Sequence, residues 1–239
     1  MSGPGGSEPP ARTGVACALL ALATLLVGAF AAEQSWIDLA VARSLYLPPG
    51  QFLFAGDPVI GAVRRLANSL ALPVILGALA LGLWSWRRRR AVLGVDPRRA
   101  AFVVLALALG PGLVVNALLK EHIGRARPAQ LEIFGGDARF TPAWTPSDQC
   151  ATNCSFVSGD VAAAAAMLAP ALLVAVRWRA LAIGAVVALT TIVAIARMTV
   201  GAHFLSDVVT AALLTWTITT GLHWLIVERR GAAPPGGAG

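Results

Sequence analysis

The chain has 239 residues, of which 57% are hydrophobic and only 13% are charged, and its mean hydropathy is +0.72. This composition is too apolar for an ordinary soluble domain and indicates an integral membrane protein. The formal charge is +7, but the arginines are scattered between apolar runs and the chain has a single tyrosine, which argues against a nucleic-acid-binding surface.

The N-terminal part contains the first predicted membrane span. Residues 1–11 are rich in Gly and Pro and are expected to be disordered, as is the tail 231–239. Residues 13–32 carry no charge and are long enough to cross a bilayer. The alternative is a cleaved signal peptide, because residues 29–31 resemble a signal-peptidase site, but the apolar core of such peptides is usually shorter. We therefore interpret this segment as an uncleaved helix.

The rest of the chain predicts an all-α polytopic membrane bundle with six transmembrane helices, forming one domain over residues 12–230. Residues 33–65 mix polar and apolar residues with Pro and Gly breakers, which favours a loop with one or two short interfacial helices. A second polar loop, residues 121–155, contains three prolines. The remaining five spans are predicted at residues 66–86, 100–119, 156–176, 180–196 and 208–227.

The distribution of arginines predicts the orientation of the bundle. With six spans, short loops and termini on one side carry eleven of the nineteen basic residues, which marks that side as cytoplasmic. Arg64 and Arg65 on the other side oppose this assignment without outweighing it. The alanine- and arginine-rich composition fits a bacterium, so we expect a protein of the bacterial inner (plasma) membrane. The eleven residues are Arg12, Arg87–Arg90, Arg98, Arg99, Arg177, Arg179, Arg229 and Arg230.

Two of the three cysteines lie in the loop on the non-cytoplasmic side. Cys150 and Cys154 would there meet an oxidising compartment, in which a disulfide can persist. The alternative is two free thiols. A zinc site is not expected, because one C-x₃-C pair without a second pair supplies only half of the ligands.

Three polar clusters fall on this same side of the membrane, at residues 120–128, 156–160 and 196–207. Ionisable groups beside spans of lipid length are costly and are by default functional. Several convergent cations, with a hydroxyl and free backbone N–H groups where a helix begins, fit a phosphate better than a carboxylate. The cations are Lys120, Arg125, Arg127 and Arg197, and the helix start is at Ser158 and Gly159.

His203 and Asp207 add a nucleophile to this phosphate site. They are four residues apart and would share one face of a helix. The carboxylate could then take the Nδ1 proton and leave Nε2 free to attack phosphorus, giving a phosphohistidine that water hydrolyses. The alternative is a histidine at a helix end with an incidental acid nearby.

These clusters resemble the three signature motifs of the type 2 phosphatidic acid phosphatase superfamily, which includes lipid phosphate phosphatases and vanadium haloperoxidases. The similarity covers roughly residues 35–227. The first motif, K-x₆-R-P, is matched by Lys120, Arg127 and Pro128. The third, S-R-x₅-H-x₃-D, is matched by Arg197, His203 and Asp207, with Ala196 in place of the serine. The second, P-S-G-H, reads Val157-Ser-Gly-Asp160.

The resemblance implies a role for each matching residue and no need for a metal or other cofactor. Lys120, Arg127 and Arg197, with Ser158 and the Gly159 N–H, would hold the phosphate. His203 would be the nucleophile and Asp207 would orient it. Three further residues lie outside the pattern: His122, His223 as a packed or interfacial histidine, and Arg125, which either lines the pocket or faces solvent.

Asp160 is the main departure from the family pattern, because it replaces the histidine that protonates the leaving group. An ordinary aspartate is ionised at pH 7, and nearby arginines favour that form. Three interpretations follow. The bound phosphate and desolvation keep Asp160 protonated as the acid, or the leaving group needs no proton, as in cleavage of a diphosphate, or catalysis is lost and the site only binds.

We therefore predict a metal-independent membrane lipid phosphatase that acts on the non-cytoplasmic face. Its partners would be membrane lipids and a lipid phosphate substrate, with no nucleic acid. Candidate substrates are an isoprenyl diphosphate, phosphatidate-type lipids, phosphatidylglycerol phosphate and a lipid A-type phosphosugar. The alternatives are a non-catalytic lipid-phosphate binder or transporter on the same scaffold and a lipid phosphotransferase. A haloperoxidase fits less well, because those relatives are soluble.

Overall fold

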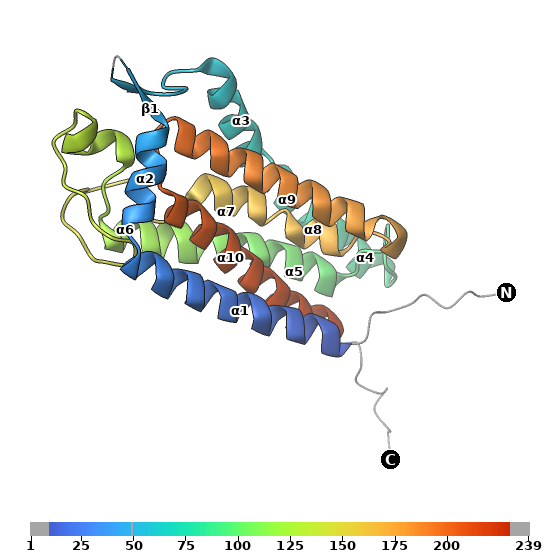
Figure 1. Ribbon diagram of the computed structural model, residues 1–239. Coiled ribbons are helices and arrows are strands. Elements are labelled where there is room, and N and C mark those ends of the chain that lie inside the picture. The colour runs from blue at the N-terminus through green and yellow to red at the C-terminus, as the bar shows by residue number, and fades with distance from the viewer. Residues whose placement is uncertain (1–9, 49, 230–239) are drawn as a thin grey trace.

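The computed structural model describes residues 10–48 and 50–229 (Figure 1). Most of the predicted disordered tails, residues 1–9 and 231–239, lies outside these residues, whereas residues 10 and 11 already belong to the first helix. The helices are α1 (Pro10–Glu33), α2 (Trp36–Ser44), α3 (Pro58–Ser69), α4 (Ala71–Arg88), α5 (Pro97–Leu107), α6 (Lys120–Ile123), α7 (Gly159–Ala165), α8 (Leu168–Leu172), α9 (Val176–Thr199) and α10 (Leu205–Leu222). The chain also has two π-helical segments, η1 (Ala108–Leu119) and η4 (His223–Glu228), and two short 3₁₀ turns, η2 (Pro128–Gln130) and η3 (Glu132–Phe134). A hairpin is formed by β1 (Tyr46–Leu47) and β2 (Gln51–Phe52).

The predicted all-α membrane fold is confirmed, whereas the count of six spans is not. Within the described residues, five helical stretches are long and apolar enough to cross a membrane. They are Thr13–Glu33, Pro58–Arg88, Pro97–Gln130, Val176–Thr199 and Leu205–Glu228.

The predicted span at residues 156–176 is instead a shorter apolar segment, Gly159–Leu172, that is divided into α7 and α8. The helix breaks at Ala166 and Met167. Pro170 explains this break, because its ring would clash with the carbonyl group four residues earlier in a continuous helix. The segment is almost entirely buried, so its short length is accommodated by protein contacts.

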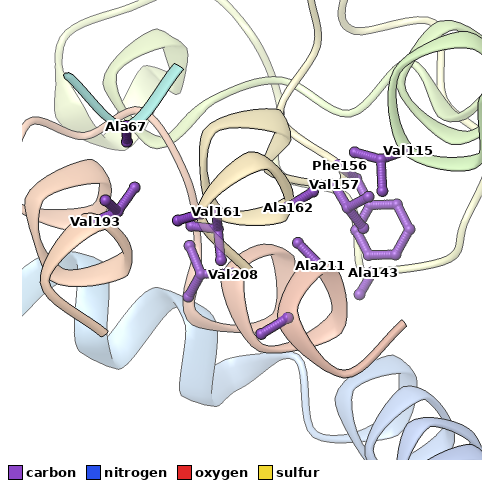
Figure 2. Packing of buried hydrophobic residues seen from close by; sticks show 12 residues of the cluster. Ala67, Val115, Ala143, Phe156, Val157, Val161, Ala162, Val193, Val208 and Ala211 are labelled. Carbon is purple, nitrogen blue, oxygen red and sulfur yellow. The ribbon is translucent and has the colours of Figure 1, made fainter. Parts of the chain in front are cut away.

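Helix α7 lies at the centre of the bundle, in contact with α3, α9, α10 and η1. Its alanines, from Ala162 to Ala165, are buried, and such small side chains allow neighbouring helices to approach closely. Figure 2 shows Val161 of α7 beside Val208 of α10, with Val193 of α9 nearby. The helix is therefore fixed on several sides. Its N-terminal end carries the second polar cluster, residues 156–160, which is held in place with it.

The two ends of the bundle differ in character. Helix α2, the hairpin and α3 lie at one end together with α6 and the long loop that follows it, whereas α1 begins and η4 ends at the other (Figure 1). Helices α2 and α3 occupy the stretch for which short interfacial helices were predicted. The outer surfaces of α1, α4 and α9 expose large apolar side chains, among them Leu25, Leu72 and Leu181, as expected for helices that face lipid.

Candidate active site

The three polar clusters of the sequence meet at the end of the bundle that carries α2 and α3. Asp160 lies in the first turn of α7, Arg197 in the last turn of α9, and Asp207 in the first turn of α10. His203 lies in the tight turn between α9 and α10. Gly201 makes this turn possible, because it has φ of +67° and a Cβ atom there would lie 2.4 Å from the ring of Phe52.

His203 is buried, and its Nδ1 atom lies 2.7 Å from the backbone carbonyl oxygen of Ser155. A carbonyl oxygen can only accept a hydrogen bond, so Nδ1 carries the proton and Nε2 keeps a free lone pair. We expected Asp207 to accept the hydrogen bond from Nδ1, but its Oδ2 atom is 3.7 Å from Nδ1, which is too far for a direct hydrogen bond. The reason is local: His203 precedes α10, so the two residues do not share a helical face.

Asp207 is completely buried and is held from both sides. Its Oδ1 atom accepts a hydrogen bond from Nη1 of Arg125 at 2.6 Å. Its Oδ2 atom accepts from the Ser155 hydroxyl at 2.5 Å and from the Phe204 N–H at 2.9 Å. Ser155 therefore contacts both His203 and Asp207 and links the two residues.

Arg125, which the sequence left open, is fully buried and does not face solvent. Its Nη2 atom lies 2.8 Å from Oδ2 of Asp38 in α2. Its guanidinium group lies 4.2 Å from the centre of the Phe204 ring and 5.4 Å from that of Phe140. Sequence reasoning missed Asp38, because it lies in no motif and is separated from Arg125 by 87 positions.

Asp160 lies among the cations that were predicted to hold a phosphate. Its Oδ2 atom is 2.9 Å from Nε of Arg197, and its Oδ1 atom accepts a hydrogen bond from the side-chain amide of Asn68 at 2.6 Å. Lys120 and Arg127 lie within electrostatic range of the same carboxylate. In the free protein, Asp160 thus neutralises part of the charge that would attract a phosphate.

Helix α3 contributes two residues that sequence reasoning did not assign to the site. Asn68 holds Asp160, as described above, and Arg64 lies one helical turn earlier on α3. Arg64 is exposed and lies within electrostatic range of Arg127 and Arg197. The amphipathic character of α3 was the only signal in the sequence that could have placed them at the membrane surface near the site.

Arg127 is attached to the loop of the two cysteines. Its Nε and Nη2 atoms donate hydrogen bonds to the carbonyl oxygen of Asn153 at 3.2 and 2.8 Å. Cys150 and Cys154 are joined by a disulfide in the structure, and Asn153 lies within the closed loop. The disulfide loop therefore positions one of the predicted phosphate-binding cations.

Ser158 and Gly159 lie where α7 begins, next to the gathered cations. Ser158 is buried, and its hydroxyl oxygen accepts the Val161 N–H at 3.5 Å as the cap of α7. Gly159 is needed for close packing, because a Cβ atom there would lie 2.5 Å from Oδ1 of Asn116. The hydroxyl oxygen accepts within the helix start, and its O–H hydrogen is still able to donate to a phosphate oxygen beside the cationic side chains.

The histidines outside the motifs lie apart from the site chemistry. His223 is buried at the other end of the bundle, with its ring 5.3 Å from that of Phe102, which agrees with a packed histidine. His122 is exposed on α6. Across the described residues, no three His, Cys, Asp or Glu side chains come together in a way that could hold a metal ion.

The environment of His203 predicts a pH dependence of stability. Burial lowers the pKa of its imidazole below the usual 6.5, although Asp207 opposes the shift; Arg197 and Arg127 add to it. As the pH falls below about 6.5, the unfolded chain binds a proton that folded His203 does not, so the folded state should lose up to about 1.4 kcal/mol per pH unit. We expect the Tm of the solubilised protein to fall more between pH 7.5 and 5.5 than the Tm of His203→Gln. His122→Gln should behave like the wild type, and equal falls for all three proteins would contradict the prediction.

Comparisons with known proteins agree with this site. A family model described as the PAP2 superfamily matches residues 99–231. A lipid A 4'-phosphatase of Francisella tularensis subsp. novicida is 36% identical over 189 residues, which cover 75% of this chain and 81% of that protein. Lipid A 4'-phosphatases of Rhizobium etli and Rhizobium leguminosarum are 44% and 43% identical over 103 residues, or 43% of this chain, and these matches cover only 40% and 44% of those proteins.

A solved structure shows the same fold. The crystal structure of a transmembrane PAP2 type phosphatidylglycerolphosphate phosphatase from Bacillus subtilis aligns with a TM-score of 0.59 and 21% sequence identity, covering 89% of this chain and 98% of that one. Fold and site thus define a polytopic helical membrane protein with a histidine beside gathered cations. The chain belongs to the PAP2 superfamily, as its motifs indicated.

Proposed function

We propose that this membrane lipid phosphatase hydrolyses a phosphate monoester on the sugar headgroup of a lipid A-type glycolipid, on the non-cytoplasmic face of the membrane. The observation that carries the proposal is the hydrogen bond from His203 Nδ1 to the Ser155 carbonyl, which leaves Nε2 as a free nucleophile near several cations. The three relatives named as lipid A 4'-phosphatases support the phosphosugar among the candidate substrates.

The first chemical step transfers the phosphoryl group to His203. Lys120, Arg127 and Arg197 bind the phosphate oxygens, and Nε2 forms a bond to phosphorus while the bond from phosphorus to the sugar oxygen breaks. The proton stays on Nδ1, where it is donated in a hydrogen bond to the Ser155 carbonyl oxygen, and the nearby Asp207 carboxylate stabilises the charge that develops on the ring. Water then attacks the phosphohistidine and releases inorganic phosphate and neutral His203.

The leaving sugar oxygen needs a proton, and Asp160 is the acid that we propose for this step. Arg197 pairs with Asp160 in the free protein, and a phosphate that binds Arg197 would take over that partner. The carboxylate would then lie beside a second anion without its cation, which favours its protonated form. Substrate binding itself thus prepares Asp160 to donate a proton to the sugar oxygen.

The proposal is tested with the purified protein in detergent and a panel of lipids. The panel contains a lipid A-type bisphosphorylated disaccharide, phosphatidic acid, phosphatidylglycerol phosphate and an isoprenyl diphosphate. We expect release of phosphate with the highest kcat/KM from the disaccharide, and an acid-labile, base-stable phosphoenzyme in rapidly quenched samples. Binding of the lipids without phosphate release would favour the non-catalytic binder, and preference for the diphosphate would overturn the assigned substrate class.

A further inference from the structure

The most unusual group of buried charges in the described part of the chain lies behind the nucleophile. Asp38, Arg125 and Asp207 are 4%, 0% and 0% exposed. Burying two carboxylates and one guanidinium group is costly and is tolerated only with close pairing and further hydrogen bonds. Of these three residues, the chemistry proposed above uses only Asp207.

We infer that Asp38 is a positioning residue for His203, acting through Arg125, Asp207 and Ser155, which links Asp207 to His203. This inference rests on the proposed function, because it assigns Asp38 a part in orienting the nucleophile of that reaction. The family match begins at residue 99, whereas Asp38 lies in α2, directly after the first membrane span. The N-terminal part of the chain would thus complete the active site as well as anchor the protein.

Arg125 transmits the position of Asp38 because a guanidinium group is a rigid planar fork. Nη2 bonds to Asp38 at 2.8 Å, and Nη1 bonds to Asp207 at 2.6 Å. Nε donates to the Thr141 carbonyl at 2.9 Å, and the Phe204 ring lies against the guanidinium group. With the plane fixed by these contacts, a shift at Nη2 must also move Nη1 away from Asp207.

Asp38 has a second connection to the same carboxylate through Ser206. Its Oδ1 atom accepts the Ser206 backbone N–H at 2.9 Å, and its Oδ2 atom accepts the Ser206 hydroxyl at 2.5 Å. Ser206 in turn accepts a hydrogen bond from Nη1 of Arg125 at 2.9 Å. Asp38 therefore holds the first turn of α10, which carries Asp207, as well as the arginine that binds it.

The kinetic test compares Asp38→Asn, Arg125→Lys and the double variant. We expect each single change to lower kcat about ten- to a hundredfold, as found when residues that orient a reacting group are replaced, with KM within about threefold. The double variant should be no slower than the slower single variant, because both changes break the same connection. Asp38→Glu, which keeps the charge but displaces the carboxylate, should also lower kcat and serves if Asp38→Asn does not fold.

Asp57→Asn is the matched control, because Asp57 caps α3 by accepting the Val59 and Ile60 N–H groups and lies outside this network. It should leave kcat within about twofold of the wild type, since a helix cap contributes mainly to stability. If Asp57→Asn lowers kcat as much as Asp38→Asn does, the effect of Asp38→Asn is explained by loss of helix capping, and Asp38 has no specific positioning role. Additive effects of Asp38→Asn and Arg125→Lys would likewise overturn the inference.

A spectroscopic readout separates this inference from the proposed function. The chain has three histidines, so their ¹⁵N side-chain resonances can be assigned with His122→Gln and His223→Gln. We expect one sharp Nδ1–H form of His203 in the wild type and a mixture of forms in Asp38→Asn but not in Asp57→Asn. If these spectra are obtained but the wild type releases no phosphate, the proposed function is refuted and the positioning role of Asp38 is not. An active wild type with an unchanged His203 signal in Asp38→Asn would refute the positioning role alone.

Discussion

Replacing His203 by Gln should lower kcat for phosphate release by about ten-thousandfold or more, the scale seen when the nucleophile of a covalent mechanism is removed. A glutamine side chain can still donate a hydrogen bond towards the Ser155 carbonyl, but its amide has no free nitrogen lone pair comparable to Nε2. The cations Lys120, Arg127 and Arg197 stay in place, so binding of a radiolabelled lipid phosphate should remain within about threefold, because their charge supplies the affinity. The measurements are kcat by phosphate release and the Kd of the lipid in detergent.

His122→Gln is the matched control for this change. His122 is exposed and lies on α6, at the same end of the bundle as the site, but outside it. It should retain wild-type kcat and phosphoenzyme formation. A phosphoenzyme that still forms in His203→Gln would place the covalent intermediate on another residue and would end the assignment of His203.

The sequence predicted most of the long apolar helices, because hydropathy is a local pattern. Hydropathy over about 20 residues marks a span whatever it packs against, and five of the predicted spans coincide with long helices. It was less informative where tertiary contacts decide the structure. The segment at 156–176 is buried and interrupted before Pro170, and Gly201 places His203 in a turn instead of on a helix with Asp207.

The partners of the residues behind the nucleophile were beyond prediction for the same reason. Arg125 was recognised as part of the first polar cluster, but Asp38 occurs as a single charge in an unremarkable local context. Helix α2 packs against α10, and this places Asp38 beside Arg125. Arg64 was expected in the loop 33–65 and Asn68 in the span 66–86, but both lie on α3, which brings Asn68 to Asp160 and Arg64 near the cations of the site. Spacing within a motif thus pointed to the groups that we propose to act on phosphate, whereas the groups that hold them come from other helices.

Asp160 is where the site departs most from the family pattern, and its position among the cations now gives a specific expectation. Asp160→Asn should lower kcat for a sugar phosphate monoester by about a hundred- to ten-thousandfold, the usual contribution of a general acid. The same variant should lower KM, because it removes a negative charge that Arg197, Lys120 and Arg127 share with the incoming phosphate. A fall in kcat together with a fall in KM distinguishes loss of an acid from general damage to the site, which would raise KM.

The dependence on the leaving group provides the sharpest measurement. A nitrophenyl phosphate monoester releases an anion that needs no proton, so Asp160→Asn should lower its kcat far less than that of the sugar phosphate. Asp160→His restores the acid found in the family motif and should retain activity on both substrates, while Asp148→Asn, a change at an exposed carboxylate of the loop, should alter neither. If Asp160→Asn hydrolyses the sugar phosphate at the wild-type rate, Asp160 is not the acid, and its pairing with Arg197 must serve to neutralise the empty site.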